Sequence, residues 1–263
     1  MPHSPGNVKT VREVGKIKVD QVAIGSCTNS SLRDLKIVAN VLKGNTILSS
    51  LHAVISPGSR QVVEHLVDSG EYSYIVRSGF RVLENSCGPC IGMGCAPSTG
   101  AISVRTFNRN FKGRSGTADA GVYLVSPEVA VATAIRGYLA DPRELGDYPE
   151  ISMPEQYYVN DNMILNPLPL EEAKNMEIKR GPNIKPLPKF KPIENELTGK
   201  VLIKVADNIT TDHIMPAGAK ILPLRSNIPE ISKYVFEALD SSFYNKAKEF
   251  DGGFIDGGEN YGQ

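Results

Sequence analysis

The stretch "VDQVAIGSCTNSSLRDLKIVANVLKG", residues 19–44, contains the repeating element from which the fold is built. Residues 19–26 form a short, mostly apolar run, which predicts a buried strand. Residues 31–44 carry apolar side chains at helical spacing and end at Gly44, so they predict an amphipathic helix. The stretch therefore predicts a strand, a polar connection and a helix in succession.

The same alternation continues towards the C-terminus. The apolar patterns predict strands over 51–59, 101–108 and 121–126, and helices over 60–70 and 126–139. The last helix begins with an N-cap serine, a proline at the first helical position and a glutamate in the first turn. Strands that alternate with helices predict a mostly parallel sheet with helices on both faces, which is a three-layer α/β/α fold.

The composition changes after residue 146. Eight of the chain's 18 prolines lie between Pro149 and Pro192, which predicts an extended, stiff linker. The run "GKVLIKVAD" after it predicts a strand that opens a second domain. We therefore predict an α/β domain over 1–146, a Pro-rich linker over 147–197, and a partial, β-rich α/β domain over 198–263 that stops before its fold is complete.

Charge and hydropathy exclude several classes of partner. The formal net charge is +0 and no basic run is present, so a nucleic-acid partner is not indicated. No apolar stretch approaches the roughly 18–20 residues that a membrane span needs, and the N-terminus lacks the apolar core of a secretory signal. We therefore expect a cytoplasmic chain. In that reducing compartment, clustered cysteines are more often metal ligands or redox groups than disulfides.

Most of the chain's cysteines gather in "NSCGPCIGMGC", residues 85–95, and the remaining one, Cys27, follows the first predicted strand. Cys87 and Cys90 have the C-x2-C spacing, which lets both sulfurs reach one metal centre. A zinc site takes four ligands, and a four-iron cluster normally takes four thiolates. The run does not match the ferredoxin spacing either. Cysteine spacing therefore leaves zinc and an iron–sulfur cluster as equal alternatives.

Two further segments carry side chains suited to binding carboxylates. In "FNRNFKGR", Asn108, Arg109 and Arg114 follow a predicted strand, where ligands of such sheets bind. Arginine forks bind carboxylates in a bidentate way, although a pair on a surface loop is often merely solvated. In the second domain, "NITTDHIMPAG" places an Asp–His pair after a strand, where it either caps a turn or orients a substrate. Arg225 is a further candidate carboxylate ligand.

Five segments in this order resemble consecutive signatures of the aconitase superfamily, namely "GSCTNS", "CGPCIG", "FNRNFKGR", "LVSPE" and "TTDHIMPAG". The resemblance covers nearly the whole chain. It implies a [4Fe–4S] cluster held by Cys27, Cys87 and Cys90. One iron would then have no protein ligand and would act as a Lewis acid. Cys95 has no counterpart in the family pattern and is expected to stay off the cluster.

The resemblance also implies a reaction and roles for the polar residues. The family interconverts hydroxy-di- or tricarboxylates through a dehydrated intermediate, such as citrate and isocitrate through cis-aconitate. The implied roles are substrate binding for Arg109, Arg114, Arg225 and Thr211, a place beside the cluster for Asn108, and catalysis for Asp212 and His213 in the smaller, swivelling domain. The sequence of the second domain is more similar to aconitases than to isopropylmalate dehydratases.

The chain also departs from the family pattern. The cluster domain is normally preceded by two further sheet domains, and the swivel domain normally continues into a loop that holds a serine base. We therefore expect a fragment that is inactive alone, with the missing domains as a separate chain. The alternatives are a non-catalytic iron–sulfur or regulatory protein, isopropylmalate or homoaconitate dehydratase specificity, and a structural zinc module.

Overall fold

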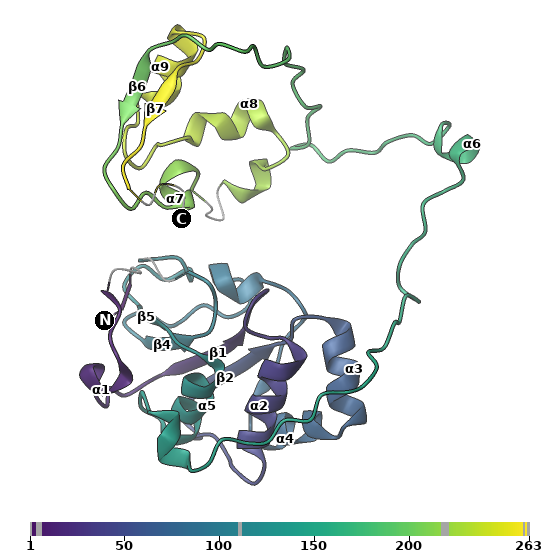
Figure 1. The fold of residues 1–263 in the computed structure, drawn as a ribbon, viewed down its shortest axis with the longest axis vertical. Coiled ribbons are helices and arrows are strands. Elements are labelled where there is room, and N and C mark those ends of the chain that lie inside the picture. The colour runs from purple at the N-terminus through teal and green to yellow at the C-terminus, as the bar shows by residue number, and fades with distance from the viewer. Residues whose placement is uncertain (1, 4–6, 110–111, 217–220, 260, 262–263) are drawn as a thin grey trace. The chain divides into compact units, whose positions relative to one another are not determined.

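The chain divides into two compact units, Met1–Leu165 and Asn166–Gln263 (Figure 1). The structure is a computed structural model that describes residues 2–3, 7–109, 112–216, 221–259 and 261. The division at residue 165 falls inside the predicted Pro-rich segment.

The first unit is built on a five-stranded sheet in the order β3-β2-β1-β4-β5, in which all neighbouring strands are parallel. Its strands are β1 (Gln21–Gly25), β2 (His52–Ser56), β3 (Arg81–Val82), β4 (Ile102–Arg105) and β5 (Gly121–Leu124). Its helices are α1 (Val11–Val14), α2 (Leu32–Leu42), α3 (Arg60–Asp68), α4 (Glu71–Arg77) and α5 (Pro127–Arg136), with 3-10 turns η2 (Gly88–Ile91) and η3 (Pro142–Leu145). The predicted α/β class with a mostly parallel sheet is confirmed. The sequence patterns missed β3 and α4.

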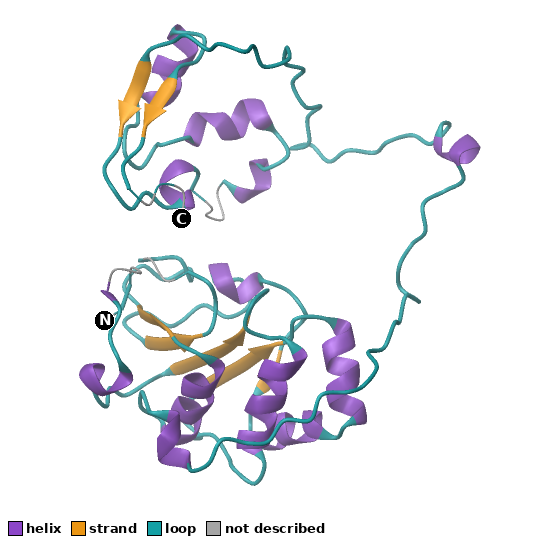
Figure 2. Cartoon of the chain, viewed as in Figure 1, coloured by secondary structure: helices purple, strands orange, loops and turns teal. Residues whose placement is uncertain are grey.

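One face of this sheet packs against α2, α3, α4 and α5, as Figures 1 and 2 show. Val22 and Ile24 of β1 point to this side and join a core with Leu35 and Val38 of α2, and all four are fully buried. Successive side chains of a strand point to opposite faces, so Gln21 and Ala23 must face the other way. The start of α2 is fixed by Ser31, whose side chain accepts a hydrogen bond from the backbone N–H of Asp34.

The opposite face of the sheet is covered by the cysteine-rich segment. Ala23 and Val54 pack there in a small buried cluster with Cys90, Cys95 and Phe107. Among the described residues, the layer on this face is a loop with the short η2 turn, where the sequence predicted further α-helix. Glycine and proline at this position favour such a turn over a longer helix.

Part of the Pro-rich segment lies against the first unit. The ring of Tyr158 stacks on that of His65 in α3, with 4.2 Å between the ring centroids. The backbone N–H of Tyr158 also donates to Nε2 of His65 at 3.1 Å. From residue 147 to residue 200 the one regular element is α6 (Leu170–Ala173), and the rest of the segment is irregular.

The second unit holds a small sheet of two parallel strands, β6 (Val201–Lys204) and β7 (Phe254–Asp256). The sequence patterns missed β7. Its helical elements are α7 (Thr211–Ile214), η4 (Leu222–Leu224), α8 (Ile228–Ile231), η5 (Ser232–Tyr234) and α9 (Phe243–Glu249). Its core is formed by Ile209, Phe236 and Phe243, and the two phenylalanine rings meet edge to face with centroids 4.9 Å apart.

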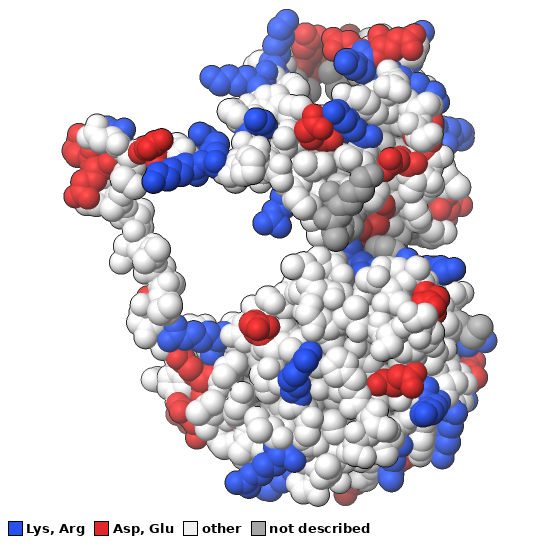
Figure 3. Space-filling view, turned by 180° about the vertical axis from the view of Figure 1, so that it is seen from behind, with Lys and Arg blue, Asp and Glu red and all other residues white. Residues whose placement is uncertain are grey.

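The surface carries charges of both signs. On the face of the first unit seen in Figure 3, acidic and basic side chains lie scattered over a mostly uncharged surface. None of the helices in the described ranges is long and apolar enough to cross a membrane.

A largely buried ion pair joins α2 to α4 and gives a first prediction. Nζ of Lys36 lies 2.6 Å from Oε2 of Glu71, and the two side chains are 9% and 12% exposed. Burial alone would raise the pKa of Glu71, but hydrogen bonds from Lys36, Ser69 and Asn40 outweigh it and hold this pKa below its usual value. We expect Glu71→Gln to lower the free energy of unfolding by about 2–3 kcal/mol at neutral pH, because Lys36 keeps its buried charge without a partner.

The lowered pKa of Glu71 also sets the sign of a pH effect. A carboxyl whose pKa is lower in the folded state contributes stability that is present above its unfolded pKa of about 4.3 and is lost as the pH falls through the folded value. Urea unfolding at neutral and acidic pH measures this. Glu171→Gln is the control, since Glu171 is 82% exposed in its pair with Lys174. Equal losses of stability for the two variants at neutral pH would contradict the prediction.

Candidate functional site

The carboxyl ends of β1, β2 and β4 converge on the cysteine-rich segment. After β1, the hydroxyl of Ser26 accepts the backbone N–H groups of Thr28 and Asn29, at 3.1 and 2.9 Å, and so forms a tight turn around Cys27. The side-chain amide of Asn29 donates to the carbonyl of Thr106, just after β4, at 2.6 Å. The loops after β1 and β4 are therefore tied together.

The loop after β2 holds the chain that leads to Cys87. The hydroxyl of Ser56, the last residue of β2, lies 2.9 Å from the carbonyl oxygen of Glu84 and 2.8 Å from that of Ser86. Ser56 is buried, so this anchor is shielded from water. No sequence pattern indicated this anchor, because an isolated serine at a strand end is common.

Cys27 is exposed and has hydrogen-bond donors directed at its sulfur. Nδ2 of Asn108 donates to Sγ of Cys27 at 3.2 Å, and Oγ1 of Thr28 lies 3.8 Å from the same sulfur. The hydrogen bonds with Thr28 and then with Asn108 lower the pKa of Cys27 below the ordinary thiol value. This environment favours a thiolate, which is the form that binds metals.

Cys87 and Cys90 lie at the two ends of one turn of 3-10 helix. Cys87 is exposed at the N-cap of η2, and Cys90 is buried with 6% of its surface exposed. Burial raises the pKa of Cys87, and the nearby Cys90 and Cys27 raise it further. Cys27 and Cys90 thus lie close enough to Cys87 to influence its thiol. Nη2 of Arg114 donates towards Sγ of Cys90 at 3.6 Å.

Cys95 occupies a different environment. It is buried in the cluster on the sheet, where Nε2 of Gln21 lies 3.4 Å from its sulfur. Burial raises the pKa of Cys95, so its thiol is favoured over the thiolate. Its chemistry is that of a small core residue.

Beneath the cysteine-rich segment lies a buried polar network that the sequence analysis did not predict. Arg105 of β4 is fully buried, and its guanidinium donates to side chains of the sheet and to carbonyls of the segment above it. The alternation of side chains in "ISVR" predicts that Ser103 and Arg105 lie on one face of the strand. The sequence does not indicate that the charged side chain of Arg105 is buried there.

The predicted substrate-binding and catalytic residues lie in both units. In the first unit, Arg109 and Asn108 are exposed in the loop after β4, and Arg114 is half-buried. In the second unit, Thr211 and Asp212 begin α7, and Nδ1 of His213 accepts the backbone N–H of Thr210 at 2.9 Å. His213 therefore takes part in a capping box. Arg225 is exposed at the end of η4.

The donor set suits an iron–sulfur cluster in its chemistry. Cys27 and Cys90 lie near Cys87, and an amide and a guanidinium donate to the sulfurs of Cys27 and Cys90. Hydrogen bonds to sulfur are a usual way in which proteins stabilise such clusters. Within the part of the chain that the structure describes, no three His, Cys, Asp or Glu side chains are arranged to hold a metal ion. The ligand set therefore stays a prediction.

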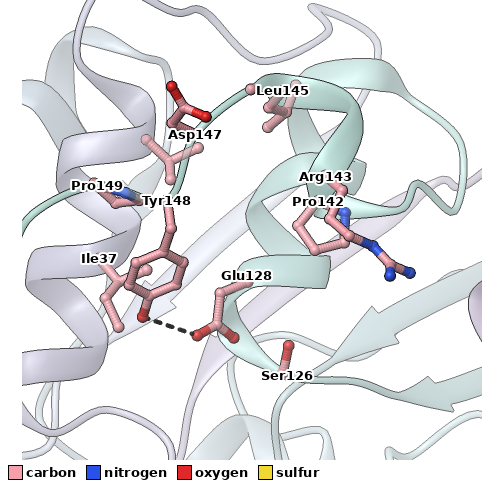
Figure 4. A pocket seen from close by; sticks show the side chains of 11 residues that line it. Ile37, Ser126, Glu128, Pro142, Arg143, Leu145, Asp147, Tyr148 and Pro149 are labelled. Carbon is pink, nitrogen blue, oxygen red and sulfur yellow. Dashed lines mark hydrogen bonds between the residues drawn. The ribbon is translucent and has the colours of Figure 1, made fainter.

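A separate pocket lies on the helical face, away from the cysteines. It has a volume of about 300 Å³ and is lined by α2, the start of α5 and the chain around residues 142–149. Figure 4 shows Tyr148 and Glu128 directed at each other across it, with the hydroxyl 3.5 Å from Oε1. Its lining contains no cysteine or histidine, so we assign the candidate site to the cysteine loops.

Several known proteins are similar to the first unit. The chain matches the model of the aconitase family (aconitate hydratase) over residues 4–137, about half of its length. It is 42% identical over 144 residues to 3-isopropylmalate dehydratase large subunit 2 of Archaeoglobus fulgidus, which covers 54% of this chain and 35% of that protein. It is 43% identical over 147 residues to the 3-isopropylmalate dehydratase large subunit of Clostridioides difficile, covering 55% of this chain and 34% of that protein.

The chain therefore spans about a third of the length of these relatives. Their names correspond to the dehydratase alternative rather than to the citrate-converting aconitases that the sequence motifs favoured. The match over residues 4–137 contains the three predicted cluster cysteines and the loop with Asn108. The chain belongs to the aconitase family.

Proposed function

We propose that the first unit is the cluster-binding part of an aconitase-family hydro-lyase, with Cys27, Cys87 and Cys90 as the ligands of a [4Fe–4S] cluster. The observation that carries the proposal is the convergence of these three thiols at the ends of β1 and η2, with Asn108 and Arg114 donating to their sulfurs. Bound there, the cluster supplies a Lewis-acidic iron for the departure of a hydroxyl group.

The side chains around the cysteines have roles that follow from their chemistry. Arg114 supplies positive charge beside Cys90. The guanidinium groups of Arg109 and Arg114 suit the carboxylates of a hydroxy-di- or tricarboxylate. Asn108 orients Cys27 through its amide. We propose that Thr211 and Arg225 of the second unit bind substrate, and that Asp212 and His213 take part in catalysis. The His213 ring keeps Nε2 available, because Nδ1 accepts the hydrogen bond of its capping box.

We further propose that the substrate belongs to the class of 3-isopropylmalate. The relatives that match the first unit bear that substrate in their names. They are named as large subunits, so we also propose that this chain works with a partner chain that supplies the rest of the site. Citrate is the second candidate, supported by the motifs of the second unit.

Anaerobic reconstitution with iron and sulfide tests this function. We expect absorbance near 400 nm that bleaches in air, and an EPR spectrum that changes on addition of 3-isopropylmalate. Citrate at the same concentration is expected to change it less. Iron without any substrate effect, even after a partner chain carrying the missing domains is added, would indicate a non-catalytic iron–sulfur protein. Zinc in place of iron, with no visible absorbance, would contradict the proposal.

A further inference from the structure

Arg105 is the most unusual buried residue of the first unit. Its exposed fraction is 0%, although arginine is among the residue types least often buried completely. Nε donates to the hydroxyl of Ser103 at 2.8 Å, and Nη2 donates to Oε1 of Gln21 at 2.7 Å. These contacts fix the guanidinium on the sheet, below the cysteine-rich segment.

The other contacts of Arg105 reach up into that segment. Nη1 donates to the carbonyl of Pro89 at 2.6 Å, and Nη2 donates to the carbonyl of Cys95 at 2.7 Å. Pro89 directly precedes Cys90 and Cys95 follows it, so one rigid fork holds the chain on both sides of the Cys90 thiol. A planar guanidinium suits such a role because its donors have a fixed geometry.

The positive charge of Arg105 has no carboxylate counter-ion among its hydrogen-bond partners in the described part of the chain. Among the described residues, its hydrogen-bond partners are two side chains and two carbonyls, and none is a carboxylate. A buried ion without a counter-charge is costly, and arginine keeps its proton even when buried. Among the described residues, Cys90 and Cys95 are nearby groups that can carry negative charge. A cluster held in part by the Cys90 thiolate would bring negative charge to the surroundings of the guanidinium.

We propose that Arg105 is a positioning residue for the cysteine loop and that its buried charge is balanced by the anionic, cluster-loaded site. This inference rests on the proposed function, because the balancing charge arises when the cysteines bind the cluster. The two parts of the role are separable by substitution. Arg105→Lys keeps the charge and loses the fork, whereas Arg105→Gln loses the charge and keeps some hydrogen bonding.

The first arm of the test uses the full chain without iron. Hydrogen exchange of the amides in residues 86–96 reports how well the loop is held, and the amides of β1 report whether the sheet is folded. We expect exchange of the loop to rise at least tenfold in both Arg105 variants, with β1 unchanged. Arg81→Gln is the matched control, since Arg81 is exposed and contacts the same loop at the carbonyl of Gly94, 3.2 Å away. Its loop exchange is expected to stay at the wild-type rate.

The second arm measures the reduction midpoint of the reconstituted cluster by EPR titration. A nearby positive charge favours the reduced, more negative state, so we expect Arg105→Gln to shift the midpoint to a more negative potential. Arg105→Lys and Arg81→Gln are expected to keep the wild-type value. If Arg105 acted through packing alone, the Arg105→Lys and Arg105→Gln variants would not differ in reduction midpoint in this way.

The outcomes distinguish this inference from the proposed function. Loop exchange and midpoint that are unchanged in Arg105→Gln would overturn the inference while the cluster remains. If the wild-type chain takes up no iron, the proposed function is wrong, and so is the claim that the cluster balances the charge of Arg105. The exchange arm would then still decide whether Arg105 positions the loop.

Discussion

Replacing Gly92 by alanine is expected to lower the free energy of unfolding by about 2–4 kcal/mol and to displace the cysteine loop. Gly92 ends η2 in the left-handed region, with φ +82°. A Cβ on this residue would overlap the carbonyl oxygen of Ser115 and would lie 2.7 Å from the carbonyl carbon and 3.0 Å from Cα of Gly116. Those atoms belong to the backbone, so the clash is not relieved by a side-chain rotation.

Gly94→Ala is the matched control for this prediction. Gly94 lies two residues further along the same loop, also at positive φ (+73°), but a Cβ there would meet nothing within 4 Å. We expect it to cost about 1–2 kcal/mol from backbone strain alone and to leave iron binding intact. Urea unfolding and iron content measure both variants. Equal effects of the two substitutions would show that the close approach of Gly92 to Ser115 does not hold the loop.

The second large effect is expected for the three proposed ligands. Substituting serine for Cys27, Cys87 or Cys90 replaces a soft thiolate with a hydroxyl, which binds iron poorly and stays protonated at neutral pH. The cluster has one iron without a protein ligand in this proposal, so the loss of another ligand leaves too few attachments. We expect each of these substitutions to lower the bound iron at least tenfold.

Cys95→Ser is the control for those substitutions. Cys95 is as deeply buried as Cys90, so it tests the effect of changing a buried cysteine of the same loop. A hydroxyl at this position lies near the amide of Gln21, which is 3.4 Å from the sulfur and can supply a hydrogen bond. We expect this variant to fold and to bind iron as the wild type does.

The fold of the first unit could be predicted from periodicity because its elements are long and regular. Residues 21–25 are buried throughout and 32–42 are strongly amphipathic, so one period dominates each segment. β3 could not be predicted, because it consists of Arg81 and Val82 alone and pairs through its backbone. β7 was missed for a similar reason, since glycines surround it and its three residues are exposed.

Candidate site residues could be named from the sequence where a residue type itself limits the chemistry. Cysteine at C-x2-C spacing and arginine after a strand have few roles, so Cys87, Cys90 and Arg114 could be named from the sequence. Ser56 and Arg105 could not, because their roles depend on which backbone carbonyls the fold places above them. His213 is the reverse case, because a residue proposed as catalytic from the sequence also caps a helix in the structure.

The iron content of the reconstituted chain tests the central claim most directly. Iron and sulfide per chain are measured after anaerobic reconstitution and desalting, for the wild type and for serine variants of Cys27, Cys87, Cys90 and Cys95. The account predicts about three to four irons per chain in the wild type and in Cys95→Ser, and little iron in the other three. Loss of iron in Cys95→Ser, or its full retention in Cys90→Ser, would contradict the proposed three-cysteine site.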